Sequence, residues 1–201
     1  GMMVCDGVDT TVTVVLIWEE GERSFLHSGN ISSKLSGGHL AGLDTVGVEY
    51  IHIGGALLLT GVEAEDWART LKRFKEAGAT TSMDPAWDAE GRWLEKLEPA
   101  LPQLDYMFPS ETEAKMLTGE EDPTQAGRSL VNFGVGKVVV KLGEQGSLLV
   151  EKENVMHQRA YEVEVADTTG AGDAYNAGFI TALMHGKDDG EARSSHGALW
   201  I

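Results

Sequence analysis

Residues 167–173 read Asp167-Thr168-Thr169-Gly170-Ala171-Gly172-Asp173, and they stand between a strand-like stretch, Tyr161 to Val165, and an apolar-periodic helix predicted over Ala174 to Met184. A turn of small residues that opens a helix places successive N–H groups at the positive end of the helix dipole, where they can bind an anion. The Asp173 carboxylate would lie beside that anion and could accept a proton from an attacking hydroxyl. The alternative is that the glycines only close a loop and that Asp173 interacts with the helix N-terminus, but the length of the string disfavours it.

The chain before this string alternates short apolar segments with longer amphipathic ones from about Val48 onward, which predicts a mostly parallel sheet with helices on its faces. Ligands bind outside the carboxyl ends of strands in such a sheet. Asp84 and Ser110 come directly after two of the strands and are therefore candidate site residues by position, although structural turn residues would look the same. Strands are predicted over Tyr50–Ile53, Thr80–Met83, Tyr106–Phe108, Lys137–Leu142 and Ser147–Val150, and helices over Glu63–Ala77 and Glu111–Leu117.

A β-hairpin is predicted near the N-terminus. The stretch from Thr11 to Trp18 is rich in Val, Thr and Ile, and a Glu-Glu-Gly-Glu turn separates it from Arg23 to His27. We expect residues 9–30 to form this separate layer and residues 42–201 to form the α/β core.

The charge balance narrows the classes of partner. There are 16 Lys and Arg against 32 Asp and Glu, a net charge of −16. Such a surface repels nucleic acid and anionic lipid, so an anionic ligand must be held locally by backbone amides, a helix N-terminus or a few cations. The single cysteine, Cys5, excludes an internal disulfide framework and leads us to expect a cytoplasmic protein. No apolar run approaches the roughly 20 residues of a membrane span, and the scattered histidines indicate no structural zinc site.

The string Asp167 to Asp173, continued by Ala174-Tyr175-Asn176-Ala177-Gly178-Phe179, resembles the C-terminal signature of PfkB-type (ribokinase-like) carbohydrate kinases. The resemblance implies that Asp173 is the base that deprotonates a sugar hydroxyl and that the amides of Gly170, Ala171 and Gly172 form an anion hole. It also implies that Asp167 and Thr169 help to hold a monovalent cation such as K⁺. The implied fold is a ribokinase-like three-layer α/β sandwich with a mostly parallel sheet, in which the hairpin is a small β-lid over the sugar.

Two upstream segments are similar to further motifs of the same family. Pro109-Ser110-Glu111-Thr112-Glu113-Ala114 resembles the Asn-x-x-Glu motif, which gives Glu113 the role of organising Mg²⁺ and phosphate through water. Ser110 departs from that motif, which has Asn at this position, and a hydroxyl has less reach than the amide of Asn. Lys141-Leu142-Gly143-Glu144-Gln145-Gly146 is similar to the segment that lies along the ATP, with Lys141, Gly143 and Gly146 as nucleotide-binding residues; a plain hairpin is the alternative.

The function implied by the resemblance is ATP-dependent phosphoryl transfer to a sugar of the 2-keto-3-deoxygluconate or fructose type. The alternative is a non-catalytic nucleotide- or sugar-binding member that acts as a sensor or oligomer subunit, and the lid suggests a homodimer. Trp18, Phe25 and Trp87 are either sugar-facing aromatics or packing residues. The chain starts later and stops earlier than a complete member of about 300 residues, so we expect the N-terminal sugar-binding units to be missing.

Overall fold

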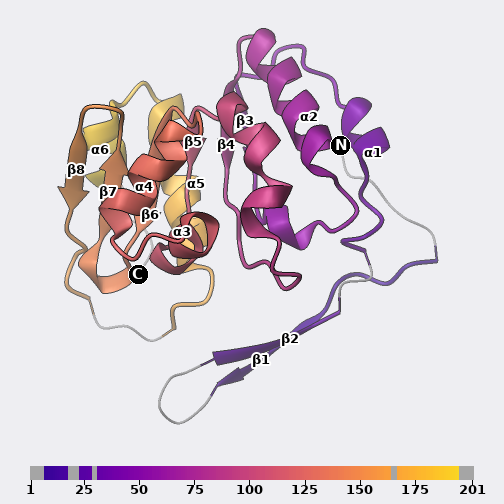
Figure 1. The fold of residues 1–201 in the computed structure, drawn as a ribbon, viewed down its shortest axis with the longest axis horizontal. Coiled ribbons are helices and arrows are strands. Elements are labelled where there is room, and N and C mark those ends of the chain that lie inside the picture. The colour runs from indigo at the N-terminus through magenta and orange to yellow at the C-terminus, as the bar shows by residue number, and fades with distance from the viewer. Residues whose placement is uncertain (1–6, 18–22, 29–30, 164–166, 195–201) are drawn as a thin grey trace.

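The computed structural model describes residues 7–17, 23–28, 31–163 and 167–194. Six strands form one sheet in the order β3-β4-β5-β6-β7-β8, and two more form a separate hairpin (Figure 1). The strands are β1 (Thr13–Ile17), β2 (Arg23–His27), β3 (Tyr50–Ile53), β4 (Thr80–Met83), β5 (Tyr106–Met107), β6 (Lys137–Lys141), β7 (Ser147–Val150) and β8 (Val155–Gln158). The α-helices are α1 (Gly37–Ala41), α2 (Ala64–Glu76), α3 (Glu111–Thr118), α4 (Pro123–Asn132), α5 (Ala171–Met184) and α6 (Asp189–Ser194), and the 3₁₀ helices are η1 (Ala56–Leu58), η2 (Trp93–Lys96), η3 (Glu98–Gln103) and η4 (Gly143–Gln145).

The sheet is parallel from β3 to β6 and antiparallel from β6 to β8. Its centre is apolar on both faces, as the run Val138-Val139-Val140 in β6 requires, because a parallel strand covered on both sides has no solvent-facing residues. The five strands predicted between Tyr50 and Val150 are confirmed, but β8 was not predicted. No strand is found at 161–163, where one was predicted, and the rest of that stretch lies outside the described residues.

Helices cover both faces of the sheet and give three layers, as expected. The larger core joins α2, α3, α4, η2 and η3 to one face and includes Met83 and Val140. The smaller core joins α5 and α6 to the other face through Phe108, Val139 and Phe179. The described helices include none with the length and apolar composition needed to cross a bilayer.

The alternation of side chains along each strand decides which residues face α5. Ile53, Met83 and Val140 belong to the larger core. Side chains one position away along the same strands therefore point to the opposite face, where α5 lies. That face receives His52 from β3, Ser82 from β4, Asp84 just after β4, and Lys141 at the end of β6. The carboxyl half of the sheet thus presents a polar group beside α5, while Phe108 and Val139 keep the middle of the same face apolar.

Helix α5 begins three residues earlier than predicted, at Ala171. Gly170 is its N-cap residue and has a φ of 78°, a left-handed conformation that glycine adopts without steric cost. Asp173 lies in the first turn of the helix. The small-residue string therefore forms both the turn and the start of the helix.

The hairpin of β1 and β2 projects from the body of the molecule (Figure 1) and exposes apolar side chains on both of its faces. Val14 pairs with Leu26 on one face, and these side chains are 49% and 61% exposed; Val15 pairs with Phe25 on the other, and Phe25 is 59% exposed. Trp18, one of the three aromatics considered above, lies outside the described residues, as does the predicted turn.

Candidate active site

The turn that precedes α5 leaves amide donors at the helix N-terminus. The Ala171 N–H donates to the Thr168 carbonyl at 3.2 Å, so of the three amides expected to form the anion hole this one is already bonded. Among the described residues, the N–H groups of Gly170, Gly172 and Asp173 have no hydrogen-bond acceptor, and the last two are adjacent in the first turn of the helix. The Asp173 side chain is exposed beside them. The turn therefore offers two adjacent donors and a carboxylate to solvent.

Lys141 brings a positive charge to the same turn. A β-carbon placed on Gly172 would lie 3.4 Å from Lys141 Nζ, so the ammonium lies against the glycine backbone. Helix dipole, amide donors and ammonium all favour an anion at this point. The structure therefore brings Lys141 next to Gly172 and Asp173, although Lys141 and Asp173 are 32 residues apart in the sequence.

Asp84 holds Lys141 in this position. The Asp84 side chain is buried, and its Oδ2 accepts hydrogen bonds from Lys141 Nζ and from Asn176 Nδ2, each at 2.6 Å. Its Oδ1 accepts from the Ala86 N–H at 3.0 Å. The carboxylate therefore joins the ends of β4 and β6 to the second turn of α5.

Ser110 and Glu113 form a capping box at the start of α3. The Ser110 N–H donates to Glu113 Oε2 at 2.7 Å, and Ser110 Oγ accepts from the Glu113 N–H at 3.3 Å. Serine and asparagine are both favoured N-cap residues, so Ser110 keeps the capping role but the cap does not explain the departure from Asn. Burial raises the pKa of Glu113 above its ordinary value, and the negative charge of Asp84 acts in the same direction, although the Ser110 N–H opposes them. One oxygen of Glu113 has a structural role, and Oε1 is the oxygen left for a water-mediated contact.

Two predicted nucleotide-binding glycines have different surroundings. Gly143 has a φ of 59° and open space around the position of a β-carbon. Gly146 has a φ of 95°, and a β-carbon there would lie 1.9 Å from the Gln158 carbonyl oxygen in β8. The packing of β8 therefore requires glycine at position 146 whether or not a nucleotide lies nearby.

His52 was not predicted as a site residue. Its ring nitrogen Nδ1 lies 2.9 Å from Ser82 Oγ, and its ring packs edge-on against Phe108 at 6.0 Å. Desolvation by its surroundings lowers the pKa of His52, as does Lys141, although Asp84 and Asp173 oppose this. The only sequence signal was its place in a strand whose neighbouring positions are apolar.

The two residues expected to hold a monovalent cation are close together in the turn. Asp167 Oδ1 accepts a hydrogen bond from the Thr169 N–H at 2.8 Å, which stabilises the turn directly. In the part of the chain that the structure describes, no group of three or more His, Cys, Asp or Glu side chains is arranged to hold a metal ion.

Residues 2–193 match the pfkB family of carbohydrate kinases. The chain belongs to this family. It is 27% identical over 175 residues to an uncharacterised sugar kinase of Archaeoglobus fulgidus, an alignment that covers 87% of this chain and 68% of the relative. It is 27% identical over 169 residues to the 2-dehydro-3-deoxygluconokinase of Bacillus subtilis, covering 76% of this chain and 52% of the relative.

A similar structure was solved with nucleotide bound. It is a ribokinase II of Escherichia coli in complex with ATP and Mg²⁺, which superposes with a TM-score of 0.74 at 26% identity over 93% of this chain and 63% of the other. This PfkB-family chain thus spans about two thirds or less of the length of proteins that it matches.

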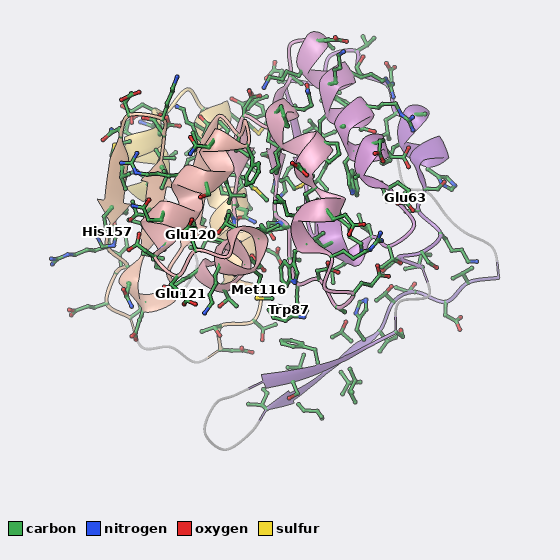
Figure 2. All side chains as sticks on the ribbon, in the orientation of Figure 1. Glu63, Trp87, Met116, Glu120, Glu121 and His157 are labelled. Atoms are coloured by element: carbon green, nitrogen blue, oxygen red, sulfur yellow. The ribbon has the colours of Figure 1, made fainter. Side chains whose placement is uncertain are left out.

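A small pocket, open to solvent, lies between the hairpin and the core of the PfkB-family fold. His27 from β2 lines one side, and Leu57, Leu58, Thr60 and residues 87–90 line the other. Trp87 is 52% exposed and lies on the side of the core that faces the hairpin (Figure 2). Of the two aromatics considered above that the structure describes, Trp87 lines this pocket and Phe25 does not.

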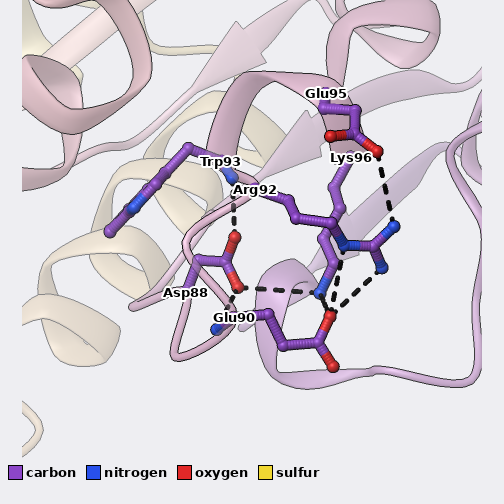
Figure 3. Close-up of polar contacts among 6 residues, drawn as sticks. All are labelled: Asp88, Glu90, Arg92, Trp93, Glu95 and Lys96. Atoms are coloured by element: carbon purple, nitrogen blue, oxygen red, sulfur yellow. Dashed lines mark hydrogen bonds and ion pairs between the residues drawn. The ribbon is translucent and has the colours of Figure 1, made fainter.

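The loop behind this pocket is held by a buried carboxylate (Figure 3). Asp88 accepts hydrogen bonds from the N–H groups of Trp93 at 2.6 Å and Glu90 at 3.0 Å, and Lys96 Nζ lies 3.6 Å away. Lys96 also pairs with Glu90 at 2.8 Å. Ala86 and Trp93 have φ values of 56° and 36°, which non-glycine residues adopt only when their surroundings impose them. Asp88 supplies that constraint at Trp93 and Asp84 supplies it at Ala86, so the two carboxylates fix the wall that carries Trp87.

Protonation of Asp88 is expected to contribute to the loss of stability of the PfkB-family fold in acid. Burial alone would raise the pKa of Asp88, but the Trp93 and Glu90 N–H groups and the charge of Lys96 lower it below its ordinary value. A carboxyl with a depressed folded pKa stabilises the fold above its unfolded pKa of about 3.9, and this contribution is lost as pH falls through the folded pKa. Asp88→Asn should lower the free energy of unfolding at pH 7 by about 2 kcal/mol and lose less stability than the wild type below pH 4.

Denaturant unfolding at pH 3, 4 and 7 measures this difference, with Asp9→Asn at an exposed position as the control. Equal acid sensitivity of Asp88→Asn and wild type would show that Asp88 does not carry the effect.

Proposed function

We propose that this chain provides the nucleotide-binding and catalytic part of an ATP-dependent sugar kinase. The observation that carries the proposal is the juxtaposition at the start of α5: two amide donors without acceptors, the Lys141 ammonium and the exposed Asp173 carboxylate. The family match and the similarity to a nucleotide-bound ribokinase II support it.

Each residue of this group has a part in the transfer. ATP, when bound, supplies the phosphoryl group, with Mg²⁺ on its phosphates. Asp173 accepts the proton of the sugar hydroxyl as the hydroxyl oxygen forms its bond to the γ-phosphorus and the bond from that phosphorus to the bridging oxygen of ADP breaks. The amides of Gly172 and Asp173 donate to the phosphoryl oxygens, and Lys141 stabilises their charge.

The residues present fit a nucleotide with Mg²⁺. Gly172 has no β-carbon between the ammonium and the turn, and Gly143 leaves open backbone at the end of β6. Glu113 keeps one carboxylate oxygen outside the capping box for a water on Mg²⁺. Asp167 and Thr169 are the proposed residues for a monovalent cation such as K⁺.

The acceptor is proposed to be a small sugar of the 2-keto-3-deoxygluconate or fructose type that binds under the hairpin. The similarity to the Bacillus subtilis 2-dehydro-3-deoxygluconokinase supports this class. The pocket with Trp87 supports the position, because an exposed aromatic ring beside polar groups suits the apolar face and hydroxyls of a sugar.

The test is calorimetry with Mg·ATP together with a coupled measurement of ADP release over a panel of sugars. A kinase binds Mg·ATP and releases ADP with at least one sugar in stoichiometric amounts. Binding of nucleotide or sugar without ADP release would instead favour a non-catalytic sensor or oligomer subunit, and the absence of any nucleotide binding would contradict both.

We propose that the chain forms a homodimer in which the exposed apolar side chains of the hairpin contact a second copy of the chain. Replacing Val14 and Leu26 by Lys is expected to weaken self-association at least about 100-fold, because burial of each side chain contributes about 1.5–3 kcal/mol and each 1.4 kcal/mol is about tenfold. The melting temperature should change little, since both side chains are exposed. Sedimentation equilibrium measures the dissociation constant, and Val46→Lys, at a position 84% exposed outside the hairpin, is the control. A wild-type protein that stays monomeric would contradict the proposal.

A further inference from the structure

The bond between Asp84 and Lys141 is unusual for a pair that serves stability alone. Both side chains are largely withdrawn from water, at 10% and 15% exposure. A buried ion pair gives little net stability, because the loss of hydration offsets the attraction, and an apolar pair of similar volume often does as well. Stability is therefore a weak explanation for these two buried charges. Their place beside the candidate active site offers a functional explanation.

Asn176 points to the same conclusion. Its side chain is 2% exposed, its Nδ2 donates to Asp84 Oδ2 at 2.6 Å, and its buried Oδ1 has no hydrogen-bond partner in the described part of the chain. The reverse orientation of the amide would place its oxygen against the carboxylate, so the chemistry fixes the orientation. An unpaired buried acceptor costs about 1–3 kcal/mol. The unpaired oxygen of Asn176 therefore lowers the stability of the fold, and the bond to Asp84 is what the amide provides in return.

The geometry shows what the bond controls. Asn176 follows Asp173 by three residues on α5, so the two side chains lie on neighbouring parts of one helix face. Lys141 comes from β6, and its ammonium lies where it would meet a side chain at Gly172. One carboxylate oxygen therefore fixes the helix that carries the base and the amides, and it fixes the ammonium as well.

On the basis of the function proposed above, we infer that Asp84 is a positioning residue of the phosphoryl-transfer site: with Asn176, it holds Lys141 and the start of α5 in register on the same anion. Asp84 itself does not touch the reacting atoms. Its carboxylate also prevents Lys141 from pairing with Asp173, which would block the base. Neutralising Asp84 frees the ammonium and loosens the helix from the sheet.

The test compares Asp84→Asn with Asp105→Asn. Asp105 also pairs with a lysine, Lys75 at 2.8 Å, and receives hydrogen bonds from Thr81, but it lies at the amino end of β5, away from the site. Asp84→Asn is expected to lower kcat about 100-fold, the scale of a misplacement of about 1 Å in a reacting group, with a smaller change in KM for ATP. Asp105→Asn should lower the melting temperature and leave kcat unchanged.

The rescue variant separates positioning from general damage. Asp84→Asn combined with Asn176→Asp returns the carboxylate to the other side of the same hydrogen bond and restores the net charge. The kcat of this double variant should be at least tenfold higher than that of Asp84→Asn. Equal kcat for wild type and Asp84→Asn, or no recovery in the double variant, would overturn the inference.

Hydrogen exchange of the unliganded protein provides a readout that needs no turnover. Asp84→Asn should speed exchange of the amides of residues 171–178, and Asp105→Asn should not. If the wild type releases no ADP while Asp84 still controls this exchange, the proposed function fails and the positioning of α5 stands. If the wild type and Asp84→Asn exchange these amides at the same rate, the positioning role of Asp84 is wrong, whatever the activity.

Discussion

Asp173→Asn is expected to lower the rate of sugar phosphorylation about 1,000-fold while changing the affinity for Mg·ATP less than threefold, since removing a general base costs 10²- to 10⁴-fold. The amide side chain fills the same space and leaves the Gly172 and Asp173 N–H groups in place, but it cannot accept the hydroxyl proton. Binding of the phosphates depends on those donors and on Lys141, so affinity should be kept.

ADP release under saturating sugar measures the rate of the Asp173 variant, and calorimetry measures its affinity. Asp122→Asn is the matched control, because Asp122 is an acidic residue at another helix N-terminus, where it accepts the Gln125 N–H at 2.9 Å. Its rate should equal that of the wild type. An Asp173→Asn protein with the wild-type rate would show that another group takes the proton.

Lys141→Met is expected to have two effects at once. Loss of the ammonium should weaken binding of a non-hydrolysable Mg·ATP analogue about 10- to 100-fold, the scale of one charge-assisted hydrogen bond of about 1.5–3 kcal/mol. It also leaves the buried Asp84 carboxylate without its cation, which should lower the free energy of unfolding by about 3–5 kcal/mol. Calorimetry below the unfolding transition separates the two effects.

The matched control for Lys141 is at the other end of the same strand. Lys137 pairs with Glu151 at 3.2 Å and with Asp189, and its ammonium lies over the Tyr106 ring. Lys137→Met should lower stability without changing the affinity for the Mg·ATP analogue. Equal loss of affinity in both variants would show that the effect of Lys141 comes from general loosening of the sheet.

The sequence predicts the sheet well because strands such as β6 and β7 are short apolar runs between turn residues, a signal that depends on local pattern alone. Helix α4 was missed, although Asp122-Pro123 is a usual N-cap and first-turn pair and would have indicated its start. Strand β8 is partly exposed and lacks a strong alternation. The start of α5 was placed late because its first residues are glycine and alanine, which carry no periodic signal.

Part of the candidate site could not be predicted, because it depends on contacts between distant residues. Asp84 was a candidate by its place after a strand, but its partners Lys141 and Asn176 are 57 and 92 residues away in sequence. Asn176 lies within the quoted motif, yet nothing local indicates that its side chain turns into the sheet. Gly146 shows the opposite case, since a residue assigned to the nucleotide has a packing reason of its own.

The most direct test of the central claim is the response of individual amides to nucleotide. In ¹⁵N-labelled protein titrated with a non-hydrolysable Mg·ATP analogue, the amide signals of Gly172 and Asp173 should show among the largest shifts, and Lys141→Met should reduce them. Saturable binding that leaves both of these amide signals unmoved would show that the nucleotide's phosphates lie elsewhere and would contradict the assignment of the anion site to the start of α5.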